Sequence, residues 1–121
     1  MKNNTEHRRY EVGEFKKDIV KSFKVELFIA GSYEEIKMIC RKHCFPKGLC
    51  LSISENLTFF AGGSEIAFKI EIFNYPPFVE KENVILEKAI ALGKNIVEEN
   101  YQWSFSIVTP KKTLYFSRRR K

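Results

Sequence analysis

Hydrophobic and polar residues alternate with a period of two in several short stretches of this chain, the pattern of strands that bury one face. The clearest stretch is 65–73, where Ile66, Phe68, Ile70 and Ile72 occupy every second position and charged residues lie between most of them. The same alternation predicts further strands over 23–29, 49–54, 57–61, 101–108 and 113–117.

Turn-forming residues separate these predicted strands. Glu55-Asn56 is expected to turn the chain between the second and third strands, and Gly62-Gly63 is a stronger hairpin signal before the fourth. Thr109-Pro110-Lys111-Lys112 predicts the turn of a final hairpin.

Two other stretches carry apolar residues at three- and four-residue spacing and predict helices. The first helix begins at Ser32, three residues before Glu35 in a capping-box arrangement, and ends before Pro46 and Gly48. The second covers about 81–99, and its predicted buried stripe is Ile85, Leu86, Ala89, Leu92, Gly93, Ile96 and Val97.

The predicted element order is β-α-β-β-β-α-β-β. This order indicates a single α+β domain over residues 23–121, with a mostly antiparallel sheet and both helices on one face. Residues 1–22 are read as a charged N-terminal extension. Their few apolar residues, Val12, Phe15, Ile19 and Val20, have a spacing that suits a short helix able to dock on a neighbouring subunit.

The net charge of +6 is concentrated at the C-terminus. Residues 111–121 hold six basic side chains and no acid, which leaves fifteen basic and fifteen acidic side chains in residues 1–110. A local basic cluster is typical of an anion-binding site, for phosphates, nucleic acid, a nucleotide or an acidic protein. Nucleic-acid binding remains possible but is less favoured, because it usually needs a basic surface along a whole groove.

No apolar run is long enough to span a membrane, and the first residues lack the apolar core of a signal peptide, so we expect a cytoplasmic protein. If the chain is encoded by a phage, the compartment is the host cytoplasm. Cys40, Cys44 and Cys50 are expected to be reduced core thiols. They lack a C-x-x-C pair, so we predict no metal and no cofactor.

The final hairpin is the first candidate site. If like residues face each other, its aromatic side is buried, with Trp103 in the core. The other side then offers hydroxyl and amide groups beside two arginines, which bind phosphate in a bidentate manner. The predicted ligand-binding residues here are Gln102, Ser104, Ser106, Thr113, Tyr115, Ser117, Arg118 and Arg119. The alternative is a solvent-facing sheet with an unstructured basic tail.

The loop 74–78 is the second candidate site, with Asn74, Tyr75 and Phe78 as predicted ligand-binding residues. Two consecutive prolines stiffen this loop, and either aromatic ring could stack on a base. The alternative is a rigid connector whose rings close the edge of the core.

Catalytic patterns are missing from the sequence. His7 and His43 have no nucleophile partner, and no nucleophile elbow, P-loop or H-E-x-x-H occurs. We therefore expect a binding protein without enzymatic activity, although a nucleotide-processing enzyme built from scattered residues stays open.

The stretches VELFIAGSYEEIKMICRKHC, NYPPF and QWSFSIVTPKKTLYFSRR resemble small phage-encoded anti-defence proteins, with the anti-Thoeris sponges as the nearest functional family. That resemblance implies a homo-oligomer that sequesters a small phosphorylated cyclic nucleotide signal, with the ligand enclosed between subunits. The alternative is an anti-CRISPR-like inhibitor that binds a host protein or nucleic-acid complex through the basic C-terminus.

Overall fold

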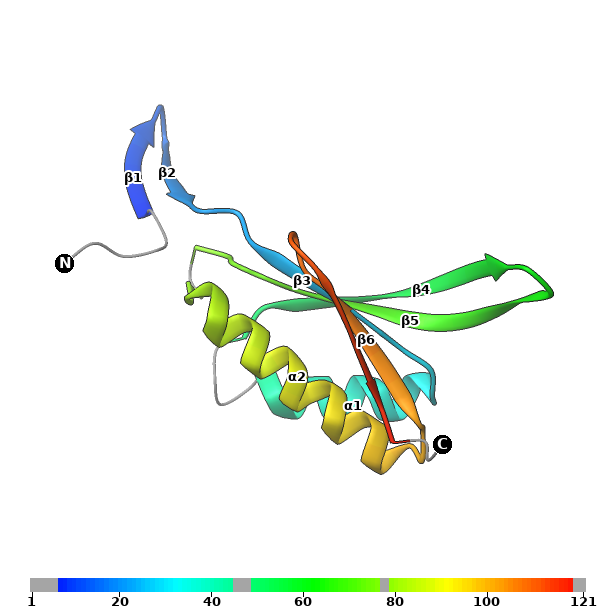
Figure 1. The fold of residues 1–121 in the computed structure, drawn as a ribbon. Coiled ribbons are helices and arrows are strands. Elements are labelled where there is room, and N and C mark those ends of the chain that lie inside the picture. The colour runs from blue at the N-terminus through cyan, green and yellow to red at the C-terminus, as the bar shows by residue number, and fades with distance from the viewer. Residues whose placement is uncertain (1–6, 45–48, 77–78, 119–121) are drawn as a thin grey trace.

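The computed structural model describes residues 7–44, 49–76 and 79–118. Its elements, in chain order, are β1 His7–Val12, β2 Phe15–Val20, β3 Lys24–Ile29, α1 Tyr33–Cys44, β4 Leu51–Phe60, β5 Gly63–Phe73, α2 Glu82–Glu99, β6 Ser104–Val108 and β7 Thr113–Ser117. Strands β4-β5-β3-β6-β7 form one sheet in which all neighbours are antiparallel. Both helices lie on one face of it (Figure 1), which confirms the predicted α+β class.

The core fills the space between that face and the helices. Alternate residues of the central strands, such as Leu27, Ile70 and Ile107, are completely buried there. The predicted stripe of α2 packs against them: Ile85, Ala89, Leu92, Gly93, Ile96 and Val97 are buried, and Leu86 is partly buried. We call this side of the sheet the inner face and the opposite side the outer face.

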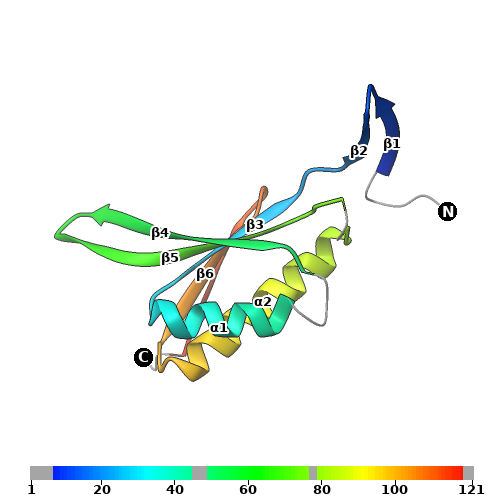
Figure 2. The ribbon, with the colours of Figure 1, turned by 180° about the vertical axis from the view of Figure 1, so that it is seen from behind.

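The chain does not turn at Glu55-Asn56. Residues 51–60 form the single strand β4, which pairs with β5 along its whole length, with Glu55 opposite Phe68 and Asn56 opposite Ala67. The long β5 strand supplies hydrogen-bond partners throughout, and the Asn56 side chain donates to the Thr58 hydroxyl at 2.9 Å within the strand. We call the half of the β4–β5 hairpin that is nearest its turn, residues 56–67, the arm. The arm extends beyond the helices (Figures 1 and 2).

The prediction that residues 101–103 continue the last hairpin with buried aromatic rings is wrong. Tyr101 is 86% exposed and Trp103 is 57% exposed. Tyr101 has a left-handed backbone (φ 55) just after Asn100 caps α2, and the Gln102 N–H donates to the Val97 carbonyl at 3.0 Å. This helix-ending motif occupies residues that the alternation assigned to a strand, so β6 begins only at Ser104.

The short helix predicted in the N-terminal extension is also wrong. Strands β1 and β2 form a separate two-stranded sheet, joined by a tight turn in which Gly13 has φ 61. Three of the four apolar residues that suit a helix, Val12, Phe15 and Ile19, also share one face of this hairpin, whereas Val20 lies on the other face.

The three cysteines are free, and only Cys40 is fully buried. Burial, together with the nearby Cys44, raises the pKa of the Cys40 thiol to about 12. No group of three potential metal ligands occurs among the described residues. Nor do they contain a helix with the length and hydropathy needed to cross a bilayer.

Candidate functional site

The β6–β7 hairpin separates its residues by face in the way the alternation predicts from Ser104 onward. The register places Phe105 opposite Phe116 on the inner face, where the two rings stack with centroids 4.7 Å apart. On the outer face Ser104 lies opposite Ser117, and Ser106 lies opposite Tyr115. A row of hydroxyl groups therefore reaches the exposed side of the sheet.

The outer face has two chemically different halves. Near the start of β3, Lys24 and Lys69 neutralise two acids: Lys24 bonds to Glu71 at 3.2 Å, and Lys69 lies 3.8 Å from Glu26 and 3.7 Å from Glu71. The hydrogen bond from Lys24 and the neighbouring lysine charges lower the pKa of Glu71. In this half of the outer face, each of these two lysines and two glutamates forms an ion pair, and we call it the ion-paired half.

The other half contains a depression of about 210 Å³, which we call the outer-face depression. It lies where the end of β3, the base of the arm and the start of β6 meet. The side chains that carry its chemistry are Phe28, Glu65, Gln102, Trp103, Ser104, Ser106 and Tyr115. Four predicted ligand-binding residues, Gln102, Ser104, Ser106 and Tyr115, are therefore brought together here.

Glu65 is the charged side chain that lines this depression. Within the described part of the chain it has neither a hydrogen bond nor an ion pair, in contrast to the neutralised acids of the ion-paired half. Among the residues that the structure describes, no lysine, arginine or histidine lines the depression. An uncompensated carboxylate beside aromatic rings suits a neutral or cationic ligand better than a phosphorylated one.

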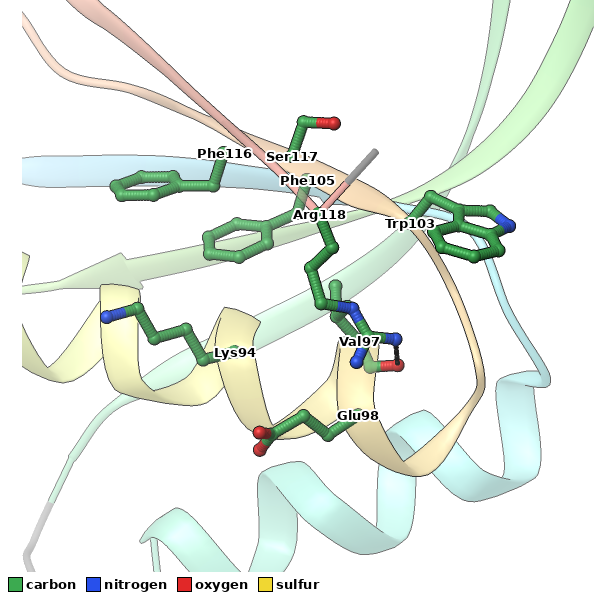
Figure 3. A pocket seen from close by; sticks show the side chains of 8 residues that line it. All are labelled: Lys94, Val97, Glu98, Trp103, Phe105, Phe116, Ser117 and Arg118. Carbon is green, nitrogen blue, oxygen red and sulfur yellow. Dashed lines mark hydrogen bonds between the residues drawn. The ribbon is translucent and has the colours of Figure 1, made fainter. Parts of the chain in front are cut away.

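Trp103 also borders a second depression of about 260 Å³ on the helix side (Figure 3), which we call the helix-side depression. Arg118 lies on this side, and its guanidinium donates to the carbonyls of Gln102 at 2.7 Å and Val97 at 3.3 Å. Lys94, Glu98 and Ser117 complete the polar part of the lining. Arg118 thus joins β7 to the end of α2, and its predicted role in ligand binding stays a prediction.

The remaining predicted site residues lie elsewhere. Thr113 pairs with Val108 beside the last turn, at the other end of the hairpin from Ser104. Asn74 follows β5 at that same end of the sheet, where its amide donates to the Lys21 carbonyl at 3.2 Å and its oxygen accepts from the Glu80 N–H at 3.0 Å. Tyr75 is half exposed and packs edge-on against Phe73. Phe78 and Arg119 lie outside the described residues.

Sequence reasoning missed Glu65 and Phe28 as parts of the site. Each was assigned to a strand, but neither belongs to the final hairpin, and only the pairing of β3 with both β5 and β6 places them beside it. The alternation alone could have placed Glu65 on the outer face, because it is an even number of residues from Lys69 and Glu71, which point to that face.

A comparison with solved structures identifies the same overall fold in a phage SAM lyase. One similar chain is that lyase in complex with S-methyl-5'-thioadenosine, with a TM-score of 0.55 at 15% identity, covering 79% of this chain and 89% of the other. The apo form of a phage SAM lyase has a TM-score of 0.57 at 13% identity, covering 82% and 91%. No protein-family model and no curated protein sequence matches this chain.

At this level of identity the comparison establishes a shared fold. Both neighbours are phage proteins, in keeping with the type of protein that the sequence resembles, but neither is an anti-Thoeris sponge. Both are named as enzymes, so the expectation of a protein without enzymatic activity is not confirmed.

Proposed function

We propose that this protein binds S-adenosylmethionine, or a closely related sulfonium nucleoside, in the outer-face depression and acts on it as a lyase. The observation that carries the proposal is the uncompensated carboxylate of Glu65 beside Trp103 and Tyr115. A sulfonium is a permanent cation that carries no proton, so it is attracted by a carboxylate and by aromatic faces.

The other side chains of the depression suit the nucleoside part of such a ligand. Trp103 is 57% exposed and Tyr115 is 66% exposed, so both rings are accessible for stacking on a purine. The hydroxyls of Ser104 and Ser106 have no partner among the described residues and can bond to a ribose. Gln102 adds an amide, although its side chain also donates to the Asn100 carbonyl at 3.3 Å.

The shared fold supports the choice of reaction, because a structural neighbour is a SAM lyase in complex with S-methyl-5'-thioadenosine. In the proposed reaction, a carboxylate oxygen of the ligand's own amino-acid part attacks the carbon bound to the sulfonium sulfur as the bond between that carbon and sulfur breaks, so the amino-acid part leaves as a lactone. The electron pair of that bond stays on sulfur, so the nucleoside fragment leaves without charge. Loss of the positive charge weakens the attraction to Glu65 and favours release of the product.

The second candidate function is sequestration of the same ligand without turnover. It is favoured by the lining that the described residues provide, which offers a carboxylate but no basic side chain to pair with it in acid–base catalysis. Capture of a phosphorylated cyclic nucleotide, as the sponge resemblance implies, finds no cationic group among the described residues that line this depression, because Arg118 faces the helix side.

One experiment tests both candidates. The purified protein is incubated with S-adenosylmethionine and separated by filtration, and the filtrate and the heat-released fraction are analysed by chromatography. Loss of S-adenosylmethionine with formation of S-methyl-5'-thioadenosine supports the lyase, and retained intact ligand supports sequestration. Neither product nor retention contradicts both.

Glu65→Gln is the sharpest variant, because it removes the charge and keeps the shape. We expect it to weaken binding of S-adenosylmethionine by about tenfold and to leave binding of neutral S-methyl-5'-thioadenosine unchanged. Glu98→Gln is the matched control, since Glu98 lines the helix-side depression next to the same tryptophan. An equal effect of the two variants would place the ligand elsewhere.

A further inference from the structure

The chain carries two amphipathic hairpins whose apolar faces have no partner within the described residues. One is β1–β2, where Tyr10, Val12, Phe15 and Ile19 lie on one face and are between 38% and 76% exposed. The opposite face of that hairpin is mostly charged, with Glu11, Lys16 and Asp18. A two-stranded sheet alone in water is only marginally stable, so this hairpin needs a surface that covers its apolar face.

The other apolar face belongs to the arm. Leu57, Phe59 and Ile66 belong to the face of the arm that continues the inner face of the sheet. The arm itself extends beyond the helices (Figure 1). These three side chains are 53%, 75% and 57% exposed. Phe68, two residues closer to the centre of the sheet than Ile66, is covered by Tyr33 of α1, with ring centroids 5.1 Å apart.

These two faces cannot cover each other within one chain. The β1–β2 hairpin and the arm lie at opposite ends of the molecule, and the front and rear views agree on this (Figures 1 and 2). Two copies arranged head to tail, by contrast, bring the hairpin of one copy to the arm of the next.

The charged residues within the two faces are complementary. Lys17 lies on the apolar face of the hairpin, opposite Tyr10. Glu55 lies on the same face of β4 at the base of the arm, opposite Phe68, and forms no ion pair within the described chain. A basic residue within one apolar face and an acidic residue within the other favour contact between unlike faces over contact between like faces.

We propose that this protein associates with itself head to tail, through the apolar face of the β1–β2 hairpin of one copy and the apolar face of the arm of the next. The contact is heterologous, since it joins two different surfaces of the same chain. It is independent of the ligand proposed for the outer-face depression, because Leu57, Phe59 and Ile66 lie on the inner-face side of the arm and Glu65 lies on the other side.

The test measures the mass of the ligand-free chain in solution by light scattering after size exclusion. We expect a mass above that of one 14.2 kDa chain. Phe15→Ser and Phe59→Ser should each weaken the association by at least about tenfold, since large aromatic side chains dominate such contacts. Both side chains are about three-quarters exposed, so neither change should affect the fold. A single-chain mass for the unmodified protein at tens of micromolar would overturn the proposal.

Mixing the two variants separates a head-to-tail contact from other arrangements. The Phe59→Ser chain keeps an intact hairpin, and the Phe15→Ser chain keeps an intact arm. Their mixture should therefore form a 1:1 pair that neither variant forms alone. No pairing in the mixture would contradict the head-to-tail contact. Self-association of Phe59→Ser alone would indicate hairpin-to-hairpin contact instead, and self-association of Phe15→Ser alone would indicate arm-to-arm contact.

A charge exchange tests the proposed complementarity. Lys17→Glu and Glu55→Lys should each weaken association, and the chain with both changes should recover most of it, because the attraction is then restored with its direction reversed. Additive loss in the double variant would contradict a contact between these two residues. Failure of ligand binding would leave all of these outcomes unchanged.

Discussion

The two faces of strand β6 are made of neighbouring residues that serve different purposes. Phe105 and Ile107 are 5% and 0% exposed on the inner face, where they pack beneath α2. Ser104 and Ser106 are partly exposed on the outer face and line the depression. Since burial constrains the inner positions, the outer positions are the ones free to vary with the ligand. Substitutions on the two faces should therefore separate stability from binding.

The largest effect on stability is expected from Phe105→Ala. This change removes a ring that stacks on Phe116 and fills the space next to α2. It should lower the free energy of unfolding by about 3–5 kcal/mol. Urea denaturation followed by circular dichroism measures this, with Tyr115→Ala on the outer face as the control. A comparable loss in both variants would contradict the division of the hairpin into two faces.

Gly93→Ala tests the closeness of α2 to the same ring. A Cβ atom at Gly93 would overlap the ring of Phe105, which is held in place by Phe116. We expect a loss of about 1–3 kcal/mol, although alanine is the better helix former. Glu87→Ala on the exposed side of α2 is the control. A stabilised Gly93→Ala protein would show that the helix lies farther from the sheet.

Trp103→Ala should lower the affinity for the ligand while leaving the stability nearly unchanged. Because the side chain is 57% exposed, we expect the free energy of unfolding to change by less than about 1 kcal/mol. The affinity for S-adenosylmethionine should fall by about tenfold, from the loss of stacking. Calorimetry and urea denaturation of the same preparation measure both quantities. A loss of stability as large as that of Phe105→Ala would place this ring in the core after all.

The smallest effect is expected from Arg118→Ala. The guanidinium donates to two main-chain carbonyls at the end of α2, and its loss should cost about 1 kcal/mol of stability. Affinity for a ligand in the outer-face depression should change less than in Trp103→Ala, because Arg118 lies over the Trp103 ring, 6.0 Å from its centroid, but does not itself line the depression. A strong loss of affinity with unchanged stability would instead support the role in ligand binding that the sequence suggests for Arg118.

Local patterns were sufficient for most of the fold. The stripe of α2 and the two faces of residues 104–108 follow directly from periodicity, because packing imposes the same periods on every sequence. The end of α2 could not be predicted in this way. A left-handed residue is usually glycine, and here it is Tyr101, so nothing in the composition marks the turn.

The site was only half predictable for a different reason. Ser104, Ser106 and Tyr115 belong to one hairpin and could be grouped from the sequence. Glu65 and Phe28 reach the same place only through the order of the strands in the sheet, which no local pattern specifies. The missing residue was the charged one. From the sequence, Arg118 and Arg119 predicted a phosphorylated ligand, whereas the carboxylate of Glu65 in the described lining is the basis of the cationic ligand that we propose.

The fluorescence of Trp103 gives the most direct test of a ligand on the outer face, because it is the single tryptophan of the chain. S-adenosylmethionine is titrated into the unmodified protein, into Ser106→Phe, which fills the outer-face depression, and into Thr113→Phe, which adds the same ring outside it. We predict saturable quenching in the unmodified protein and in Thr113→Phe, and its loss in Ser106→Phe. Equal quenching in all three proteins would contradict a ligand in the outer-face depression.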